Sequence, residues 1–542
     1  MKNILILGAG LMQKPAILSA RELGYKTYVI DADPKAVAVP LADEFCKIDL
    51  KAREEILAYA EKIKKAEGLS AVFTAGTDFS ASVSYVCEKL GLPTHSFEAA
   101  QNASIKTRMR ECFSKAGVPS PDFININEAS KKELQLSEDG ISYKEKKLLF
   151  PLVVKPVDNM GARGCRMIRS KGEFESSFSA AIKASRSGNA ILEEYMEGEE
   201  YSIDALVYKG TFTVTGFAVR HIKYPPYFIE TGHTMPAVLS KEVGDQLISI
   251  FACGAKALGL TSGAAKADIK FTKNGAMIGE IAGRLSGGYM SGWTYPYASD
   301  LNLTKEAILI AAGEEPCQLI SRRKPVDFNC GKAELTKPYD LFEIPCLRTS
   351  AERAWISIPG KVQYIEEIKE YTDQAVRNVL PRATVTLGGS VDFPRNNVEK
   401  CGNVIAVSHS RDIAISAAED AASNVFITLE PNDAETEKFL KGDCLPDEEG
   451  FPPAAFAKLS DEELSKIEGE IPQNQSISSL IPDFILEKYG KLTDWNYNTI
   501  SQTALKFDIL RKNHPALDAK SFWSALMRGG LQAAVYISDS KK

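Results

Sequence analysis

The first hundred residues alternate short apolar runs with helical patterns, and this alternation restricts the fold more than any other feature of the chain. An apolar run at residues 4–7 ends at Gly8-Ala9-Gly10, a helical pattern continues to Leu23, and a second apolar run at residues 27–30 ends at Asp31. Parallel strands need a crossover, usually a helix, so the pattern predicts a βαβ unit. With further helices expected at residues 53–66 and 79–90, and a strand at residues 71–73, we predict a small doubly wound sheet.

Changes of pattern divide the 542 residues into four expected domains. The doubly wound domain covers residues 1–100, and an α+β domain covers residues 101–325, with a flap subdomain at about 120–195. A β-rich cap is expected at residues 326–432 and a mostly helical accessory segment at residues 433–542, where Ser460 and Glu463 match a capping box. The Lys- and Glu-rich stretch at residues 127–147 predicts a solvated insertion. The predicted fold class is therefore α/β and α+β.

Composition excludes several classes of protein. With 65 Lys and Arg against 71 Asp and Glu, the net charge is -6, which disfavours nucleic acid as a partner. The ten cysteines contain no Cys-x-x-Cys pair, as is typical of reduced thiols in the cytoplasm. No apolar run approaches the ~20 residues that span a bilayer. We therefore expect a cytoplasmic protein without a membrane or nucleic-acid partner.

The loop after the first apolar run resembles a dinucleotide-binding fingerprint. Gly8 and Gly10 follow the run, and Asp31 comes about twenty residues later, as in proteins that bind a pyrophosphate at a helix N-terminus. Gln13 occupies the position of the third glycine. A structural or substrate-facing tight turn is therefore favoured over a site for NAD or FAD, although an oxidoreductase remains an alternative.

A second motif combines a lysine with a glycine-rich loop. Lys155 lies on an expected strand at residues 150–156, and Gly161 and Gly164 lie in the loop before a second strand at residues 165–169. Backbone N–H groups of such a loop can surround phosphate oxygens, while the lysine supplies a positive charge. The motif therefore predicts a phosphate-binding flap; by itself, a hairpin with two glycines is more often a plain turn.

A third motif is an acidic connector between two expected strands, at residues 191–204. Its exposed backbone can hydrogen-bond a purine edge, and the carboxylate of Glu200 can accept hydrogen bonds from ribose hydroxyls. The alternative is an acidic surface loop without a ligand.

The fourth motif is an expected β-hairpin at residues 264–284. If residues 273–275 form its loop, Asp268 lies directly opposite Glu280, which places two carboxylates about 5 Å apart. Such a pair is unfavourable without a cation, and Mg²⁺ takes one or two carboxylates together with water and substrate phosphates. A strict two-residue turn would instead pair Asp268 with Ile281, and a solvated acidic pair remains the alternative to a metal site.

Two further residues are candidates for contact with a substrate. Arg284 shares strand parity with Glu280 and precedes a flexible glycine-containing run, where a guanidinium suits a carboxylate or a transferring phosphoryl group. His233 is one of five histidines and is expected in a loop. An ordinary surface arginine and a turn histidine are the alternatives.

Taken in order, these segments resemble the ATP-grasp superfamily from residue 1 to about residue 430. The resemblance implies that ATP and Mg²⁺, with Mn²⁺ as an alternative, bind this chain. It implies phosphate contacts from Lys106, Lys155 and the flap residues Met160, Gly161, Ala162, Arg163 and Gly164; adenine contacts from Glu193 and Met196; a ribose contact from Glu200; metal coordination by Asp268 and Glu280; and catalytic roles for Arg284, Lys155 and His233.

Within the superfamily, residues 279–288 and 233–236 look most like L-amino acid ligases. Biotin carboxylase and carboxyaminoimidazole ribonucleotide synthetase share the same domain order. Many relatives have Asn where this chain has Ala282, which puts a second metal ion in doubt. The resemblance does not extend to the segment after Pro431.

The resemblance implies a ligase in which a carboxylate attacks the γ-phosphoryl group of ATP and an amine captures the resulting acylphosphate. Its partners would be a small carboxylate and a small amine, with a homodimer left open. A bicarbonate-using enzyme similar to the two carboxylating relatives and a non-catalytic ATP-binding module are the alternatives.

Overall fold

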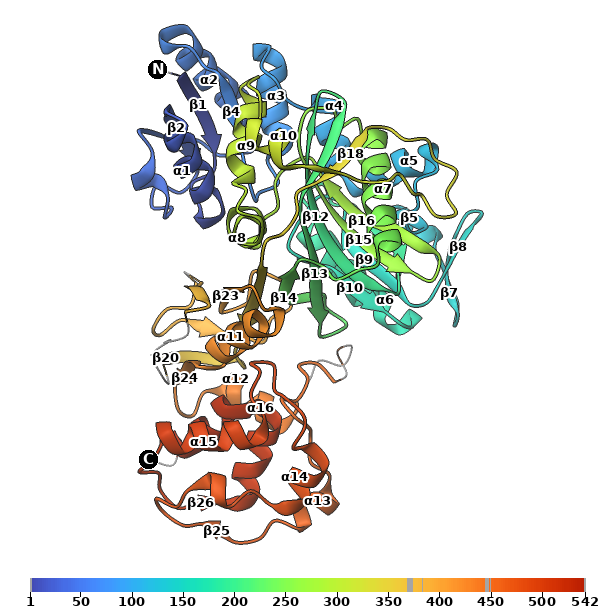
Figure 1. The fold of residues 1–542 in the computed structure, drawn as a ribbon. Helices are drawn as coiled ribbons and strands as arrows, with labels where there is room; N and C mark the ends of the chain where they lie inside the picture. The colour runs from blue at the N-terminus through green and yellow to red at the C-terminus, as the bar shows by residue number, and fades with distance from the viewer. Residues whose placement is uncertain (1, 368–373, 383, 444–447, 449, 541–542) are drawn as a thin grey trace. The chain divides into compact units, whose positions relative to one another are not determined.

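The computed structural model describes residues 2–367, 374–382, 384–443, 448 and 450–540 (Figure 1). The chain forms two compact units. The first comprises Met1–Met160, Met167–Arg220 and His233–Ser350, and the second comprises Gly161–Arg166, His221–Gly232 and Ala351–Lys542. The second unit therefore combines most of the expected cap with the expected accessory segment.

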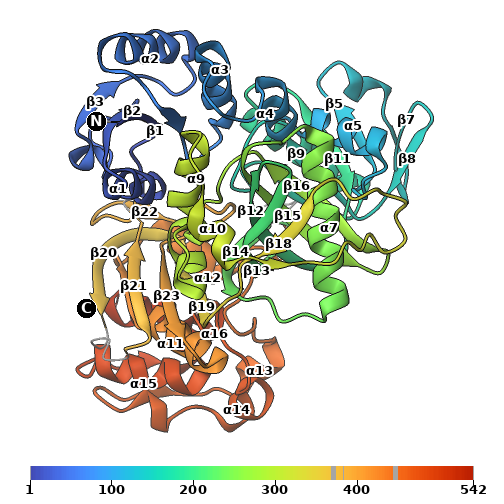
Figure 2. The ribbon, with the colours of Figure 1, turned by 45° about the horizontal axis from the view of Figure 1, so that its top comes forward.

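The N-terminal part of the first unit contains a parallel sheet with the order β3-β2-β1-β4. Ile4 and Ile6 of β1 pack in the same apolar cluster as Ile17 of α1, whereas Leu5 and Leu7 pack with residues of α2 and α3. Figure 2 shows these helices on opposite faces of the sheet. The strands are β1 (Lys2–Leu7), β2 (Tyr25–Asp31), β3 (Glu44–Lys47) and β4 (Ala71–Phe73), and the helices are α1 (Lys14–Glu22), α2 (Arg53–Glu67) and α3 (Ser80–Leu90).

The flap region is built on an antiparallel sheet with the order β10-β9-β11-β5. The stretch expected to be a solvated insertion is partly folded: it contributes most of a small sheet, β6-β7-β8, and its residues Leu134 and Ile141 are buried. That expectation was wrong because these two apolar side chains join the flap core. The elements are β5 (Phe123–Ile126), β6 (Gln135–Leu136), β7 (Gly140–Tyr143), β8 (Lys146–Leu149), β9 (Leu152–Pro156), β10 (Arg166–Ile168), β11 (Ala190–Glu194) and α6 (Phe174–Ala184).

A larger sheet in the first unit has the strand order β16-β15-β12-β13-β14, with β16 at its edge. Helix α7 packs against β15 and β16, and Leu247 and Phe251 of α7 share a buried cluster with Ile269 and Ile278 of the two strands (Figure 1). The strands are β12 (Glu199–Tyr208), β13 (Thr211–Lys223), β14 (Ile229–Met235), β15 (Gly263–Thr272), β16 (Gly275–Ala282), β17 (Lys324–Pro325) and β18 (Asp340–Glu343), and the helices are α4 (Phe97–Ser104), α5 (Lys106–Ala116), α7 (Lys241–Leu258), α8 (Tyr295–Ser299), α9 (Leu303–Ala311) and α10 (Cys317–Arg322).

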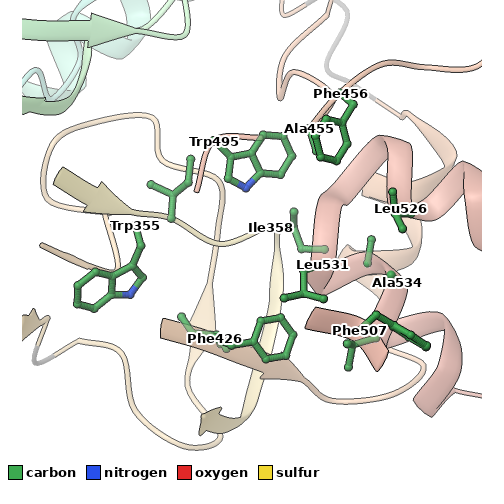
Figure 3. Close-up of a cluster of buried hydrophobic side chains, with 14 of the residues drawn as sticks. Trp355, Ile358, Phe426, Ala455, Phe456, Trp495, Phe507, Leu526, Leu531 and Ala534 are labelled. Carbon is green, nitrogen blue, oxygen red and sulfur yellow. The ribbon is translucent and has the colours of Figure 1, made fainter. Parts of the chain in front are cut away.

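The second unit has one continuous apolar core. Ile358 and Phe426 of the expected cap belong to the same cluster as Trp495, Phe507 and Leu526 of the C-terminal segment (Figure 3). The elements are β19 (Thr349–Trp355), β20 (Gly360–Glu367), β21 (Val376–Pro381), β22 (Ser390–Val391), β23 (Gly402–Ser408), β24 (Val425–Leu429), β25 (Glu470–Ile471), β26 (Leu517–Asp518), α11 (Arg411–Ser423), α12 (Ala434–Lys441), α13 (Asp461–Ser465), α14 (Asp483–Tyr489), α15 (Ile500–Leu510) and α16 (Ala519–Asp539).

The predicted fold class is confirmed, since parallel and antiparallel sheets alternate with helices through the chain. The predicted capping box is present at the start of α13, where Ser460 Oγ accepts from Glu463 N and the Glu463 carboxylate accepts from Ser460 N. No helix among the described residues has the length and hydropathy that a membrane span requires.

Candidate active site

Asp268 and Glu280 are direct partners across the antiparallel pair of β15 and β16. The predicted pairing is present, but the turn differs from the expected one. Thr272 pairs with Gly275, so the loop contains two residues. Ile269 then pairs with Ile278 and Asp268 with Glu280, so Gly279 is an extra residue on β16 and forms a bulge. A one-residue shift changes the face to which a side chain points. The bulge therefore brings Glu280 to the face that carries Asp268.

Basic side chains surround this acidic pair. Lys266 Nζ and Arg220 Nη1 form ion pairs with Asp268, the latter at 2.9 Å from Oδ1, and Lys106 Nζ lies 3.4 Å from Glu280 Oε1. Burial raises the pKa of Glu280, but the neighbouring cations, chiefly Lys106, outweigh this effect and lower the pKa to about 2. Glu280 is therefore ionised at neutral pH. The side chains of Asp268 and Glu280 are 19% and 35% exposed.

The donor set fits Mg²⁺ bound jointly with phosphate. Within the described part of the chain, no group of three or more His, Cys, Asp or Glu side chains converges on a point. A closed protein cage, as in structural zinc sites, is thus not formed there. Two carboxylate side chains on adjacent strands match the preference of Mg²⁺ for one or two carboxylates completed by water and substrate phosphates.

Lys155, on β9, is held by a buried carboxylate. Its Nζ atom lies 2.6 Å from Glu193 Oε2 on β11, and Arg110 Nε donates to Glu193 Oε1 at 2.9 Å. Desolvation raises the pKa of Glu193, but Arg110 and Lys155 more than offset it, so the pKa lies below its ordinary value. The expected adenine contact of this side chain is not favoured, because the carboxylate is 3% exposed and binds two cations.

Lys106, the first residue of α5, links the acidic pair to the base of the flap. Its Nζ donates to Asn159 O at 3.0 Å, and its backbone N donates to Val157 O at 2.9 Å. Asp158 accepts hydrogen bonds from Ser185 Oγ and from the backbone N–H groups of Arg186 and Ser187. The strand that carries Lys155 and the helix that carries Lys106 are thus joined at the start of the flap.

The flap loop itself has the backbone of a glycine-rich turn. Gly161, Ala162 and Gly164 have φ values of 68°, 60° and 66°, in the left-handed region. Residues 161–166, including Arg163, belong to the second unit, where Asn397 N donates to Gly161 O at 3.0 Å. Met160 belongs to the first unit.

Arg220, on β13, connects the expected ribose carboxylate to the expected metal site. The same Nη1 atom lies 2.6 Å from Glu200 Oε1 and 2.9 Å from Asp268 Oδ1. Lys270 Nζ lies 3.5 Å from Glu200 Oε2 and donates to Met196 O at 3.1 Å. The sequence motifs did not single out Arg220 or Lys270, because only the strand register brings them beside Glu200.

Arg284 lies just after β16 and pairs with Asp78, in the segment between β4 and α3, with Nη2 at 3.3 Å from Oδ1. Its Nη1 also donates to Leu285 O at 3.0 Å. His233 lies in strand β14 rather than in a loop, is fully buried, and has Nε2 2.8 Å from Thr294 Oγ1. The loop expectation for His233 was wrong because residues 229–235 form a buried strand.

Side chains of the same sheet domain bind the backbone amides of the glycine loop after β1. Ala9 N donates to Asp31 Oδ2 at 2.7 Å and Gly10 N donates to Gln13 Oε1 at 3.1 Å. A Cβ atom at Gly8 would lie 3.0 Å from the Gln13 side chain, which fills the space beside the turn. The amides that a dinucleotide pyrophosphate would use are engaged, which favours the structural alternative for this loop.

Comparison with known proteins agrees with this geometry. Residues 148–292, which include Lys155, the flap, Asp268, Glu280 and Arg284, match the family model of the ATP-grasp domain. This segment is an ATP-grasp domain. The prediction of this superfamily is confirmed.

Relatives of this ATP-grasp chain include several ligases. It is 27% identical over 343 residues to carnosine synthase 1 of Gallus gallus, covering 60% of the chain and 36% of the relative. It is 27% identical over 247 residues to alanine–anticapsin ligase of Bacillus subtilis, covering 41% of the chain and 50% of the relative. The matches thus span half or less of these two proteins.

Among solved structures, the L-amino acid ligase of Bacillus licheniformis has the same fold as this ATP-grasp chain, with a TM-score of 0.64 and 18% identity. That match covers 79% of the chain and 99% of the other protein. The predicted class, a ligase that forms C–N bonds, agrees with the ligases among the sequence relatives.

Proposed function

We propose that the ATP-grasp site of this chain joins a carboxylate to an amine at the expense of ATP, through an acylphosphate. The observation that carries the proposal is the acidic pair of Asp268 and Glu280, with Lys106 at 3.4 Å from Glu280. Two carboxylates beside a lysine suit a metal-bound triphosphate, whose charge needs both a divalent ion and basic side chains.

The nucleotide would lie along the elements that carry the basic residues. Lys106 and Lys155 would neutralise phosphate oxygens. Met196 and Glu200 would contact adenine and ribose, with Glu200 oriented by Arg220. Asp268 and Glu280 would hold Mg²⁺, which withdraws charge from the transferring phosphoryl group. Glu193 would serve by holding Lys155.

The first step would form a bond between a carboxylate oxygen and the γ-phosphorus while the bond to ADP breaks. The amine nitrogen would then attack the acyl carbon and phosphate would leave, with loss of one proton from nitrogen. Arg284 would bind the carboxylate or the transferring phosphoryl group, because its guanidinium lies beside the loop that follows the metal-binding strand. His233 would position β14 through Thr294, since it is fully buried.

The carboxylate and the amine would be small molecules, as expected from the ligases that this chain resembles. Amino acids are the first class to test, since relatives of the chain include an L-amino acid ligase and an alanine–anticapsin ligase.

The test is a screen for ADP release by the full chain with Mg²⁺, ATP and pairs of L-amino acids, with bicarbonate as a separate arm. We expect ADP release that depends on two substrates, together with an amide product of the matching mass. ADP release that depends on bicarbonate alone would favour a carboxylating enzyme. ATP binding without ADP release across the panel would favour a non-catalytic module.

A further inference from the structure

The edge strand β16 is completed by side chains of α5 rather than by another strand. Met109 Sδ accepts from Ile281 N at 3.4 Å, and Arg110 Nη2 donates to Gly279 O at 2.6 Å. Ile278 N donates to Pro119 O at 2.9 Å, just beyond the same helix. Backbone groups at a sheet edge need such partners when they are buried. Helix α5 therefore supports the part of β16 that contains the bulge.

The bulge at Gly279 decides where Glu280 points. Toward the turn, Ile269 pairs with Ile278, whereas beyond the bulge Asp268 pairs with Glu280. Without the extra residue, Gly279 would oppose Asp268, and Glu280 would oppose Ala267 on the other face of the sheet. The carbonyl group that Arg110 binds belongs to the extra residue itself. Arg110 thus stabilises the backbone conformation on which the acidic pair depends.

The same guanidinium group also holds the carboxylate beside Lys155. Arg110 Nε donates to Glu193 Oε1 at 2.9 Å, and Glu193 Oε2 lies 2.6 Å from Lys155 Nζ. The side chains of Arg110 and Glu193 are 1% and 3% exposed. Because Arg110 is buried, it acts on the site through the two groups that it binds, Glu193 and Gly279 O. Its planar guanidinium group fixes the positions of both.

We propose that Arg110 is a positioning residue that couples the metal-binding carboxylates to the phosphate-binding lysine. Its Nη2 group holds the bulge that turns Glu280 toward Asp268, and its Nε group holds Glu193 against Lys155. The inference rests on the proposed function, because it assigns Asp268 and Glu280 to a metal and Lys155 to a phosphate. A lysine at position 110 keeps the charge but lacks the planar group that binds both partners.

The test compares Arg110→Lys with Arg108→Lys on the same helix. Arg108 Nη1 donates instead to Gln101 Oε1 at 3.2 Å, so it is a matched control on the same helix. Binding of Mn²⁺ to the full chain in the presence of ADP, followed by electron paramagnetic resonance, reports the metal site without turnover. We expect Arg110→Lys to weaken Mn²⁺ binding about 10-fold or more, as loss of a group that orients a ligand does, and Arg108→Lys to change it less than about 2-fold.

A second pair of variants separates the two contacts of Arg110. Glu193→Gln frees Lys155 but keeps Arg110 on Gly279, so we expect it to raise the KM for ATP while the Mn²⁺ affinity changes less than about 2-fold. Arg110→Gln/Glu193→Gln removes the Arg110–Glu193 ion pair as a whole, so neither of these two positions keeps an unpaired buried charge. If Arg110→Lys does not fold, this double variant decides the question, and it should show the same loss of about 10-fold in Mn²⁺ affinity.

Mn²⁺ binding by folded Arg110→Lys, or by the folded double variant, at the affinity of the unmodified chain would overturn the role of Arg110. Equal losses in Arg108→Lys and Arg110→Lys would also overturn it, because the effect would then belong to the helix in general. If the unmodified chain binds no Mn²⁺ with ADP, the proposed metal site fails, and the proposed function fails with it.

Discussion

Lys106 Nζ lies 3.4 Å from Glu280 Oε1, so the first residue of α5 and a carboxylate of β16 share one charged site. Both side chains belong to segments that the sequence motifs had assigned to ATP binding. The ion pair also explains why the pKa of Glu280 is about 2 in spite of its burial, since Lys106 is the strongest of the cations that oppose desolvation.

The lysine residues of the site should be required for phosphoryl transfer. We expect Lys106→Met and Lys155→Met to lower kcat for ADP release about 100-fold or more, because each removes a charge that stabilises the transferring phosphoryl group. Lys147 is an exposed residue of β8, so Lys147→Met is the matched control and should leave kcat within about 2-fold. Steady-state assays of ADP release measure all three. Full turnover by Lys155→Met would remove this lysine from the mechanism.

The acidic pair should determine the requirement for metal. We expect Glu280→Gln and Asp268→Asn to raise the Mg²⁺ concentration for half-maximal ADP release about 10-fold or more, because an amide is a weaker ligand than an ionised carboxylate. Glu242→Gln, an exposed change on α7, serves as the control. Titration of Mg²⁺ at saturating ATP gives the comparison. An unchanged Mg²⁺ requirement in Glu280→Gln would place the metal elsewhere.

Asp204 should make stability depend on pH. It is fully buried in β12, and Oδ2 accepts from Ser286 N and Oγ at 3.0 and 2.8 Å. Burial raises its pKa from 3.8 to about 6, only partly opposed by these hydrogen bonds. The folded chain therefore binds more protons than the unfolded chain between these values, and this group lowers stability as the pH rises through that window.

Asp204→Asn removes this titration while keeping an oxygen acceptor. Its free energy of unfolding, relative to the unmodified chain, should increase by about 1–3 kcal/mol between pH 4 and pH 7.5. Urea denaturation at several pH values provides the measurement. A difference between the two proteins that stays constant over this range would show that Asp204 does not titrate there.

The C-terminal segment should be needed for the stability of the second unit. Phe507 is fully buried, with its ring centroid 5.1 Å from that of Phe522 in the shared core. We expect Phe507→Ala to lower the free energy of unfolding by about 3–5 kcal/mol because it leaves a cavity. Leu505→Ala, two residues earlier and 55% exposed, should change it by less than about 0.5 kcal/mol. Thermal unfolding followed by tryptophan fluorescence compares them; similar losses would argue against a common core.

Local patterns predicted most of the elements. The expected strand at residues 71–73 matches β4, and the expected helices at residues 53–66 and 79–90 match α2 and α3 closely. Hydrophobic periodicity was sufficient there, because these segments bury one face or both faces against a single sheet. The stretch at residues 127–147 was misjudged because its buried apolar side chains Leu134 and Ile141 lie among polar and charged neighbours along the chain.

The hairpin at residues 264–284 shows the limit of prediction from local patterns. The opposition of Asp268 and Glu280 was predicted from a three-residue loop, yet the structure reaches it with a two-residue loop and a bulge at Gly279. The bulge is supported by Arg110, which lies 169 positions away in the chain. No local signal at Gly279 specifies that support.

The amino-acid sequence alone was enough to indicate the superfamily, the order of its motifs and the side chains that carry charge, because these depend on residue type and short spacing. The partners of Glu193, the burial of His233 and the place of Arg220 between Glu200 and Asp268 depended on the folded chain. Strand register and long-range packing decide which charged side chains meet. Both depend on contacts between residues that are distant along the chain, so local sequence patterns do not specify them.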